Sequence, residues 1–314
     1  MTSSQDPSGP DPQPRVPRVG VVFRPQLPPE RLHEFAPAAA AAGLDDLWLW
    51  EDCFLEGGLT SATAALAGTS SLRVGLGLMP VPLRNPALAA MEIATLARLY
   101  PGRFVPAAGH GVLPWMEQVG ARAGSPLTLL REWVTAVRSL LQGQTVTVSG
   151  QYVRLDHVAL DWPPQTVPPL LVGARGPKTV ALAGAHADGL VLDAGIAVDG
   201  VRRAVKTAAA ARPHEVIVYL LCATGDDARE RVQAELATLP YPPPTQVAVG
   251  TPAQVAGVIR SFAAAGATSV VLQPTAHDPD PLSTIHLAAQ AKSLLTGPEG
   301  NRRTSAQARP TQRP

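Results

Sequence analysis

The feature that most constrains how this 314-residue chain can fold is an alternation of short β-branched runs with alanine-rich segments of helical length. This alternation predicts βαβ units, in which a helix returns the chain between parallel strands. The expected strands are Val19 to Phe23, Asp46 to Trp50, Arg73 to Met79, Arg103 to Ala108, Leu170 to Gly173, Gly189 to Asp193, Val216 to Cys222 and Ser269 to Gln273. Eight strands with intervening helices predict a (β/α)₈ TIM barrel of the α/β class.

Helices are expected between the strands and after the last one. The expected ranges are Pro29 to Ala42, Thr60 to Ala67, Pro86 to Tyr100, Leu127 to Leu141, Pro177 to Ala185, Val198 to Ala211, Ala228 to Leu239, Pro252 to Ala265 and Leu282 to Leu295. A proline near the first turn of several ranges and a glycine after Ala42 and Ala265 agree with these boundaries. From Gly143 to Pro169 the pattern is interrupted, and Ser149-Gly150 predicts a small hairpin inserted after the fourth helix.

Composition divides the chain into three parts. Proline-rich residues 1–17 and polar residues 297–314 predict a disordered leader and a disordered tail around one barrel domain at 18–296. Four arginines in that tail leave a weak anion-binding arm open. The region after the seventh strand, where a longer substrate lid could lie, is short and contains Pro240 and Pro242 to Pro244.

Charge and cysteine content exclude several classes of function. Hydrophobic residues make up 46% of the chain, enough for a globular core. A net charge of +1 provides no excess of positive charge for binding nucleic acid or an anionic membrane. Cys53 and Cys222 lack metal-ligand spacing, so no disulfide framework or cysteine zinc site is indicated, and no metal is expected. Without a membrane-length apolar run or a signal-peptide pattern, the expected location is cytoplasmic.

Catalytic residues of such barrels follow the strands at their C-terminal ends. After the second strand stand Trp50, Glu51 and Asp52. In one interpretation, a carboxylate here has a structural role and caps the second helix or pairs with an arginine. In the other, burial beside Trp50 raises its pKa and makes it a proton donor or acceptor. After the fourth strand comes Gly109-His110-Gly111, whose glycines allow the backbone to lie close to a flat ligand.

The loop after the fifth strand is a candidate phosphate site. It comprises Gly173, Ala174, Arg175, Gly176, Pro177, Lys178 and Thr179. Glycines before a helix N-terminus offer free backbone N–H groups and a positive dipole end, and two cations add charge. The alternative is a simple turn with two solvated cations. The loop fits neither the P-loop nor the Rossmann pattern.

Two segments resemble the luciferase-like flavin and deazaflavin oxidoreductases. One runs from Leu83-Arg84-Asn85-Pro86 through Gly102-Arg103-Phe104 to Gly109-His110-Gly111. The other runs from Pro169 through the candidate phosphate loop to Ala187-Asp188-Gly189. The resemblance extends from about Val19 to Leu295 and is strongest to the reductases that use coenzyme F420.

The resemblance implies a site as well as a fold. It implies that a flavin or deazaflavin ring lies across the barrel mouth, with its phosphate at Gly173 to Thr179. It also implies a bulge in the third strand at Gly77-Leu78, often with a cis peptide, that presses on the ring. Glu51, Asp52 and His110 are the implied catalytic residues, and Phe23, Trp50 and Trp115 are the expected pocket walls.

The cofactor expected from the resemblance is the deazaflavin coenzyme F420, with FMN as the alternative. The expected function is hydride transfer between F420 and a small organic substrate, with Glu51 or His110 supplying the proton. An FMN-dependent monooxygenase served by a separate flavin reductase and a non-catalytic flavin-binding barrel remain open. The family pattern further implies a homodimer through the helices at Thr60 to Ala67 and Pro86 to Tyr100.

Overall fold

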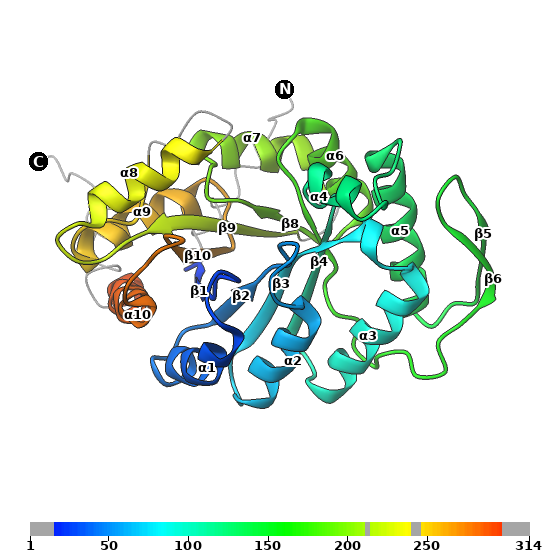
Figure 1. Ribbon diagram of the computed structural model, residues 1–314, viewed down its shortest axis with the longest axis horizontal. Coiled ribbons are helices and arrows are strands. Elements are labelled where there is room, and N and C mark those ends of the chain that lie inside the picture. The colour runs from blue at the N-terminus through cyan, green and yellow to red at the C-terminus, as the bar shows by residue number, and fades with distance from the viewer. Residues whose placement is uncertain (1–15, 211–213, 240–245, 297–314) are drawn as a thin grey trace, which may run out of the picture.

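The computed structural model describes residues 16–210, 214–239 and 246–296. Nearly all of the predicted leader, the predicted tail and the proline-rich segment after the seventh strand therefore lie outside the described residues. Eight parallel strands close into a barrel in the order β1-β10-β9-β8-β7-β4-β3-β2, and helices surround it (Figure 1). The predicted TIM barrel is confirmed.

Each barrel strand coincides with an expected strand to within a residue or two at either end. The barrel strands are β1 (Arg18–Val22), β2 (Asp46–Leu49), β3 (Arg73–Pro80), β4 (Phe104–Gly109), β7 (Leu171–Gly173), β8 (Gly189–Leu192), β9 (Glu215–Cys222) and β10 (Ser269–Pro274). The 3₁₀ turns and helices are η1 (Pro29–Arg31), α1 (Leu32–Ala41), α2 (Gly58–Ala67), η2 (Val81–Leu83), α3 (Pro86–Leu99), α4 (Leu113–Gln118), α5 (Pro126–Leu141), α6 (Pro177–His186), α7 (Val198–Ala208), α8 (Ala228–Thr238), α9 (Pro252–Ala264) and α10 (Pro281–Thr296).

Three features differ from the expected elements. Helix α4 was not expected, because its six residues are too few to show a helical period. Helix α7 stops short of its expected end, since Ala209 adopts a left-handed conformation with φ of 44°. The inserted hairpin between α5 and β7 is confirmed, with strands β5 (Val146–Ser149) and β6 (Arg154–Val158), but its second strand lies later in the chain than the expected Tyr152 to Arg154.

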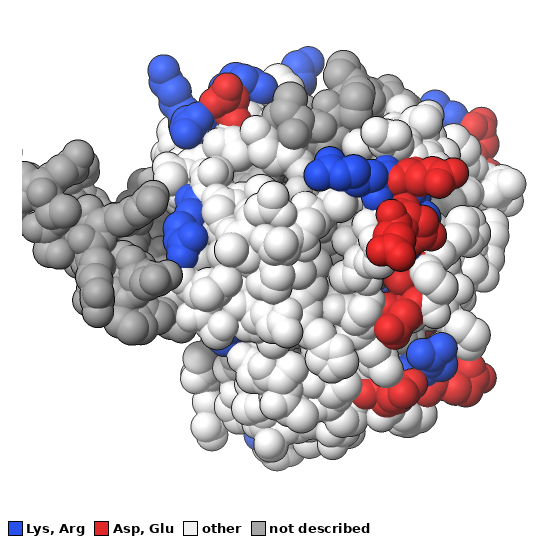
Figure 2. Space-filling model, turned by 90° about the vertical axis from the view of Figure 1, so that its left-hand side faces the viewer, with Lys and Arg blue, Asp and Glu red and all other residues white. Residues whose placement is uncertain are grey.

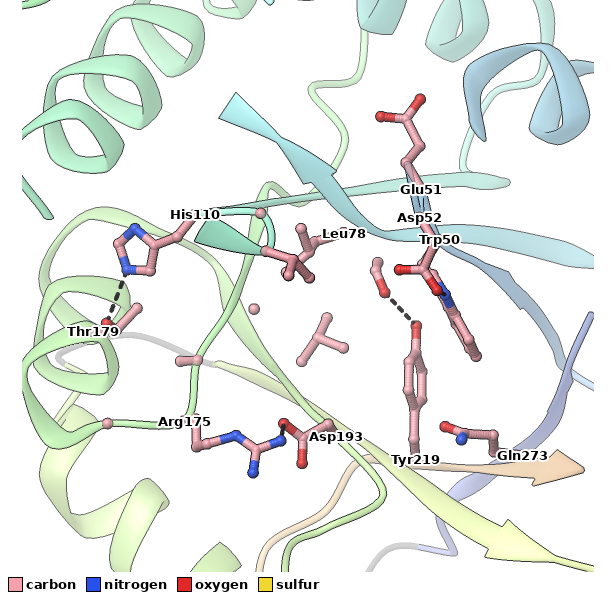
Figure 3. Close-up of a pocket in the computed structure, with 17 residues that line it drawn as sticks. Trp50, Glu51, Asp52, Leu78, His110, Arg175, Thr179, Asp193, Tyr219 and Gln273 are labelled. Carbon is pink, nitrogen blue, oxygen red and sulfur yellow. Dashed lines mark hydrogen bonds and ion pairs between the residues drawn. The ribbon is translucent and has the colours of Figure 1, made fainter. Parts of the chain in front are cut away.

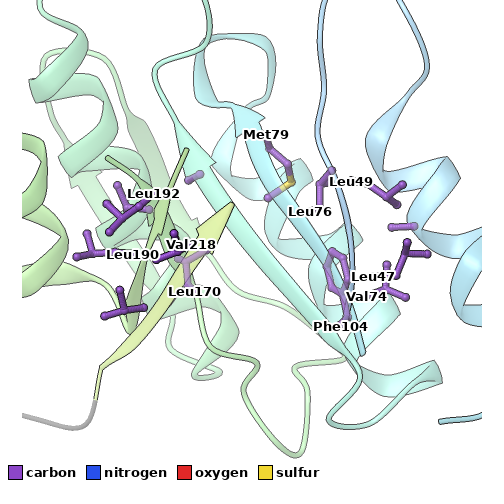
Figure 4. Packing of buried hydrophobic residues seen from close by; sticks show 14 of the residues in the cluster. Leu47, Leu49, Val74, Leu76, Met79, Phe104, Leu170, Leu190, Leu192 and Val218 are labelled. Atoms are coloured by element: carbon purple, nitrogen blue, oxygen red, sulfur yellow. The ribbon is translucent and has the colours of Figure 1, made fainter. Parts of the chain in front are cut away.

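Alternation along β2 divides the core into two parts. Leu47 and Leu49 point outward and pack with residues such as Leu76 of β3 in the cluster between strands and helices (Figure 4). Trp48 points inward, where it packs edge to face against Tyr219 of β9 with ring centroids 5.9 Å apart. A side chain at Gly75 on the neighbouring strand would collide with the Trp48 ring, so this glycine is what allows a tryptophan inside the barrel.

An ionic network closes the N-terminal end of the barrel. The Asp46 carboxylate, 1% exposed, lies 3.0 Å from Arg73 and 3.6 Å from Arg18, and it accepts a hydrogen bond from the Ser269 hydroxyl. Both arginines also pair with Glu215 at the start of β9. With this end filled by paired charges, the opposite end is where a ligand can enter the barrel.

Among the described residues on the face seen in Figure 2, lysines and arginines do not gather into one basic patch. Acidic side chains gather in a band along one edge of that face, while lysines and arginines are scattered. Among the described residues, no helix is long and apolar enough to cross a lipid bilayer.

Candidate active site at the C-terminal end of the barrel

A cavity of about 460 Å³ opens at the C-terminal ends of the barrel strands. The residues that line it are Trp50, Glu51, Asp52, Gly77, Leu78, His110, Gly111, Val112, Gly173, Ala174, Arg175, Gly176, Thr179, Val191, Asp193, Tyr219 and Gln273. Twelve of these seventeen were expected from the sequence, and loops far apart in the chain bring them together (Figure 3). A cavity of this size, mostly apolar with a few polar groups, suits an organic ligand.

The third strand carries the expected bulge. Its pairing with β4 shifts register between Gly77 and Met79, and the Gly77–Leu78 peptide is cis. The buried Tyr219 hydroxyl donates a hydrogen bond of 2.9 Å to the Gly77 carbonyl, and burial raises the pKa of this phenol well above its usual value. Tyr219 therefore stays protonated and holds the bulge in place. Leu78 projects into the cavity (Figure 3). It has room there because Gly109 and Gly173 carry no side chains, which would otherwise collide with it.

Glu51 lies at the cavity edge, where both of its carboxylate oxygens are engaged. They accept hydrogen bonds of 2.5 and 2.7 Å from Arg84, and one of them also accepts 2.9 Å from the backbone N–H of Gly58 at the start of α2. This carboxylate thus both caps the second helix and pairs with an arginine. In Figure 3 it points away from Asp52.

Asp52 points toward the cavity (Figure 3). Its Oδ2 accepts a hydrogen bond of 2.9 Å from the Trp50 indole N–H, and among the described residues no hydrogen bond reaches Oδ1. The Trp50 ring is held in turn by Tyr219, 5.9 Å away between centroids, and by the Arg24 guanidinium, 5.5 Å from the ring. A carboxylate oxygen that faces a cavity from a rigid support can exchange a proton with a bound molecule.

His110 lies at the other end of the cavity from Asp52 (Figure 3). Its Nε2 is 3.2 Å from the Thr179 hydroxyl. Burial lowers the pKa of His110, although the Pro126 backbone opposes the shift, so the ring favours its neutral form.

The loop after β7 provides polar groups beside His110. Helix α6 begins at Pro177 without a side-chain cap, so its first N–H groups remain for a ligand. A side chain at Gly176 would have no atom within 4 Å, and the cavity is therefore open at this N-terminus. Arg175 forms an ion pair with Asp193, which follows β8 (Figure 3).

Five residues expected at the site do not line the cavity. Phe23 is fully buried and packs edge to face on Phe35, with ring centroids 5.4 Å apart, in the cluster outside the barrel. Trp115 is half-buried on α4, and Lys178 is exposed on α6. Gly109 lies behind Leu78, and Pro177 lines a neighbouring hollow. Adjacent strand residues face opposite sides, which explains why Phe23 points outward while Val22 points into the barrel.

The five lining residues not expected from the sequence are Val112, Val191, Asp193, Tyr219 and Gln273. Asp193 and Gln273 were the last residues of expected strands, a position that should have marked both. Tyr219 lies in mid-strand, and only the inward register of β9 reveals it. The described residues include no group of three or more His, Cys, Asp or Glu that could hold a metal ion.

Comparisons with curated proteins place the chain beside reductases and dehydrogenases, several of which are named as F420-dependent. It is 28% identical over 175 residues to a 5,10-methylenetetrahydromethanopterin reductase of Methanolobus tindarius, covering 56% of this chain and 53% of that protein. It is 32% identical over 203 residues to an F420-dependent hydroxymycolic acid dehydrogenase of Mycobacterium tuberculosis, covering 59% and 55%. The chain therefore spans about half the length of the curated relatives it matches.

Solved structures share the fold at low sequence identity. The coenzyme F420-dependent tetrahydromethanopterin reductase of Methanopyrus kandleri matches with a TM-score of 0.76 and 20% identity over 88% of this chain and 98% of that chain. The oxygenating constituent of 3,6-diketocamphane monooxygenase of Pseudomonas putida, solved with FMN, matches with a TM-score of 0.70 and 15% identity over 88% and 97%.

The family model for luciferase-like monooxygenases matches residues 8–242, most of the chain. This match confirms the resemblance that the two sequence segments indicated. The protein belongs to the luciferase-like monooxygenase family.

Proposed function

We propose that this protein is an oxidoreductase that transfers hydride between coenzyme F420 and a small organic substrate. The observation that carries the proposal is the cavity itself, with an uncapped helix N-terminus at one end and a supported carboxylate at the other. The curated relative named as an F420-dependent hydroxymycolic acid dehydrogenase supports this choice of cofactor.

The residues present fit a ring with a phosphate at its far end. The N–H groups at the start of α6, the Thr179 hydroxyl and the Arg175 guanidinium would hold the phosphate. Leu78, supported by the bulge and Tyr219, would press on one face of the ring. When bound, a deazaflavin supplies a ring carbon that accepts or donates hydride.

In this scheme Asp52 exchanges the proton with the substrate. Hydride transfer to or from a carbonyl or alcohol also requires a proton to move at the substrate oxygen. Asp52 Oδ1 faces the cavity without a hydrogen-bond donor from the described residues, while the Trp50 N–H fixes Oδ2. Gln273 faces the same end of the cavity and would orient the substrate (Figure 3).

The structure favours a different role for each of the other two candidate acids. Both oxygens of Glu51 are committed to Arg84 and to the start of α2, so we assign this residue to holding the Asp52 loop. His110 lies with Thr179 beside the phosphate end, so we assign it to cofactor binding.

The second candidate is an FMN-dependent monooxygenase that works with a separate flavin reductase. The fold match to the camphane monooxygenase solved with FMN favours it, because FMN also carries a phosphate on the chain attached to its ring. A barrel that binds flavin without catalysis is the remaining alternative.

The test follows absorbance of reduced and oxidised F420 with a panel of small carbonyl compounds and alcohols. A substrate-dependent change with wild-type protein, reduced about 10²- to 10⁴-fold in Asp52→Asn with cofactor affinity retained, is the expected result. Asp156→Asn in the inserted hairpin, 87% exposed, is the matched control and should behave as wild type. Turnover only with reduced FMN and oxygen would establish the monooxygenase, and cofactor binding with no turnover under either condition would indicate the non-catalytic barrel.

A further inference from the structure

A second hollow of about 370 Å³ lies directly behind the candidate phosphate loop. It shares Ala174, Arg175 and Asp193 with the main cavity, so the two spaces meet at the Arg175–Asp193 ion pair. From there the second hollow continues between the first turn of α6 and one face of α7. The second hollow therefore lies next to the end of the main cavity at which α6 begins.

The charge of the second hollow favours an anion. Arg175 and Arg203 line it together with a single acid, Asp193. Arg203 is exposed on α7, and no acidic side chain in the described residues pairs with it, whereas its neighbour Arg202 pairs with Asp199. The guanidinium of Arg203 is thus available for a carboxylate or phosphate.

The walls of the second hollow are shaped by small and apolar residues. A side chain at Gly200 would come within 2.7 Å of Ile196 and 3.8 Å of the Arg203 guanidinium, so glycine at this position leaves room on the α7 face. Leu192 and Ala204, both buried, line the hollow as well. The second hollow thus offers an apolar wall beside the Arg203 guanidinium.

We infer that this second hollow binds the glutamate carboxylates of a tail that extends past the phosphate of the cofactor, with Arg203 as their charged contact. The inference rests on the proposed function. FMN ends at its phosphate and would leave the hollow empty, whereas coenzyme F420 continues past a phosphodiester into a tail of glutamate carboxylates. The hollow would therefore distinguish the two cofactors at a distance from the ring.

The test compares binding of two forms of F420, one with several glutamates and one that ends at the phospholactate. Each is titrated by fluorescence into wild-type protein, Arg203→Glu and the matched control Arg202→Glu, with circular dichroism to verify folding. We expect Arg203→Glu to weaken binding of the glutamate-bearing form about tenfold or more and to leave binding of the short form nearly unchanged. Arg202→Glu should change neither affinity, and the loss in Arg203→Glu should shrink as salt is raised.

Two results would overturn the inference. Equal affinities of Arg203→Glu and wild type for the glutamate-bearing form, or equal losses for both forms, would show that the tail does not contact the hollow, while the proposed function would stand. Failure of wild-type protein to bind either form of F420 would overturn the proposed function, and the inference would fall with it.

Discussion

Replacing Glu51 by glutamine separates a supporting role from a catalytic one. The carboxylate accepts two hydrogen bonds from Arg84 and one from the Gly58 N–H, and its side chain is 9% exposed. Glutamine keeps the size and one acceptor oxygen but loses the charge. The change therefore leaves Arg84 without its bidentate partner and α2 without an anion at its N-terminus.

The expected cost follows from these contacts. Breaking a fully buried ion pair costs about 3 to 5 kcal/mol. Here Arg84 is 19% exposed and keeps Glu92 at 3.5 Å, so the loss should be smaller. We expect Glu51→Gln to lower the free energy of unfolding by about 2 to 3 kcal/mol. Asp52→Asn perturbs a single hydrogen bond from Trp50 and should cost less than about 1 kcal/mol.

Urea unfolding, followed by tryptophan fluorescence and circular dichroism, measures both changes. Arg84→Gln and the double variant complete a cycle, whose coupling free energy should account for most of the Glu51→Gln loss. A Glu51→Gln protein with wild-type stability and a turnover reduced more than about a hundredfold would refute this reasoning. That result would indicate that Glu51 is the proton donor.

Further predictions concern pH, the core and assembly. Folding lowers the pKa of His110 below its unfolded value, so its contribution to stability is complete above about pH 6.5 and is lost as pH falls through the folded pKa. Urea unfolding at pH 7 and at pH 5 should therefore show a smaller loss of unfolding free energy in His110→Gln than in wild type. Equal losses in the two proteins would contradict this role of His110. Gly75→Val should destabilise the barrel by about 1 to 3 kcal/mol or prevent folding, because its side chain would collide with Trp48; wild-type urea stability would be inconsistent with the packing described. We expect a homodimer through α2 and α3, where the apolar side chain of Met91 is 56% exposed. Sedimentation should show a dimer for wild type and a monomer for Met91→Glu. A wild-type monomer at micromolar concentration would exclude this dimer.

The barrel was predictable from the sequence because its signals are local. β-branched runs, alanine-rich helices and the prolines at helix starts act within a few residues, and all eight barrel strands were expected. Helix α4 escaped prediction because it is too short for a periodic signal.

The site was only partly predictable, because side-chain direction depends on register and on partners far away in the chain. Glu51 and Asp52 are adjacent in sequence, yet one faces Arg84 and the other faces the cavity. That choice depends on an arginine 33 residues away, which no local pattern specifies. Phe23, which was expected at the cavity, lies outside the barrel, and Tyr219, which was not expected, lines the cavity. Both outcomes depend on strand register, since a shift of one residue along a strand moves a side chain from one face to the other.

The central claim, that the cavity binds a deazaflavin with its phosphate at the start of α6, is tested most directly by a binding titration of coenzyme F420 against FMN. Fluorescence titration should show tighter binding of F420 to wild-type protein, and Arg175→Ala and Thr179→Val should each weaken that binding about tenfold, as loss of a charge-assisted or polar phosphate contact predicts. Tighter binding of FMN would contradict the choice of cofactor, and unchanged F420 affinity in both variants would contradict the phosphate site.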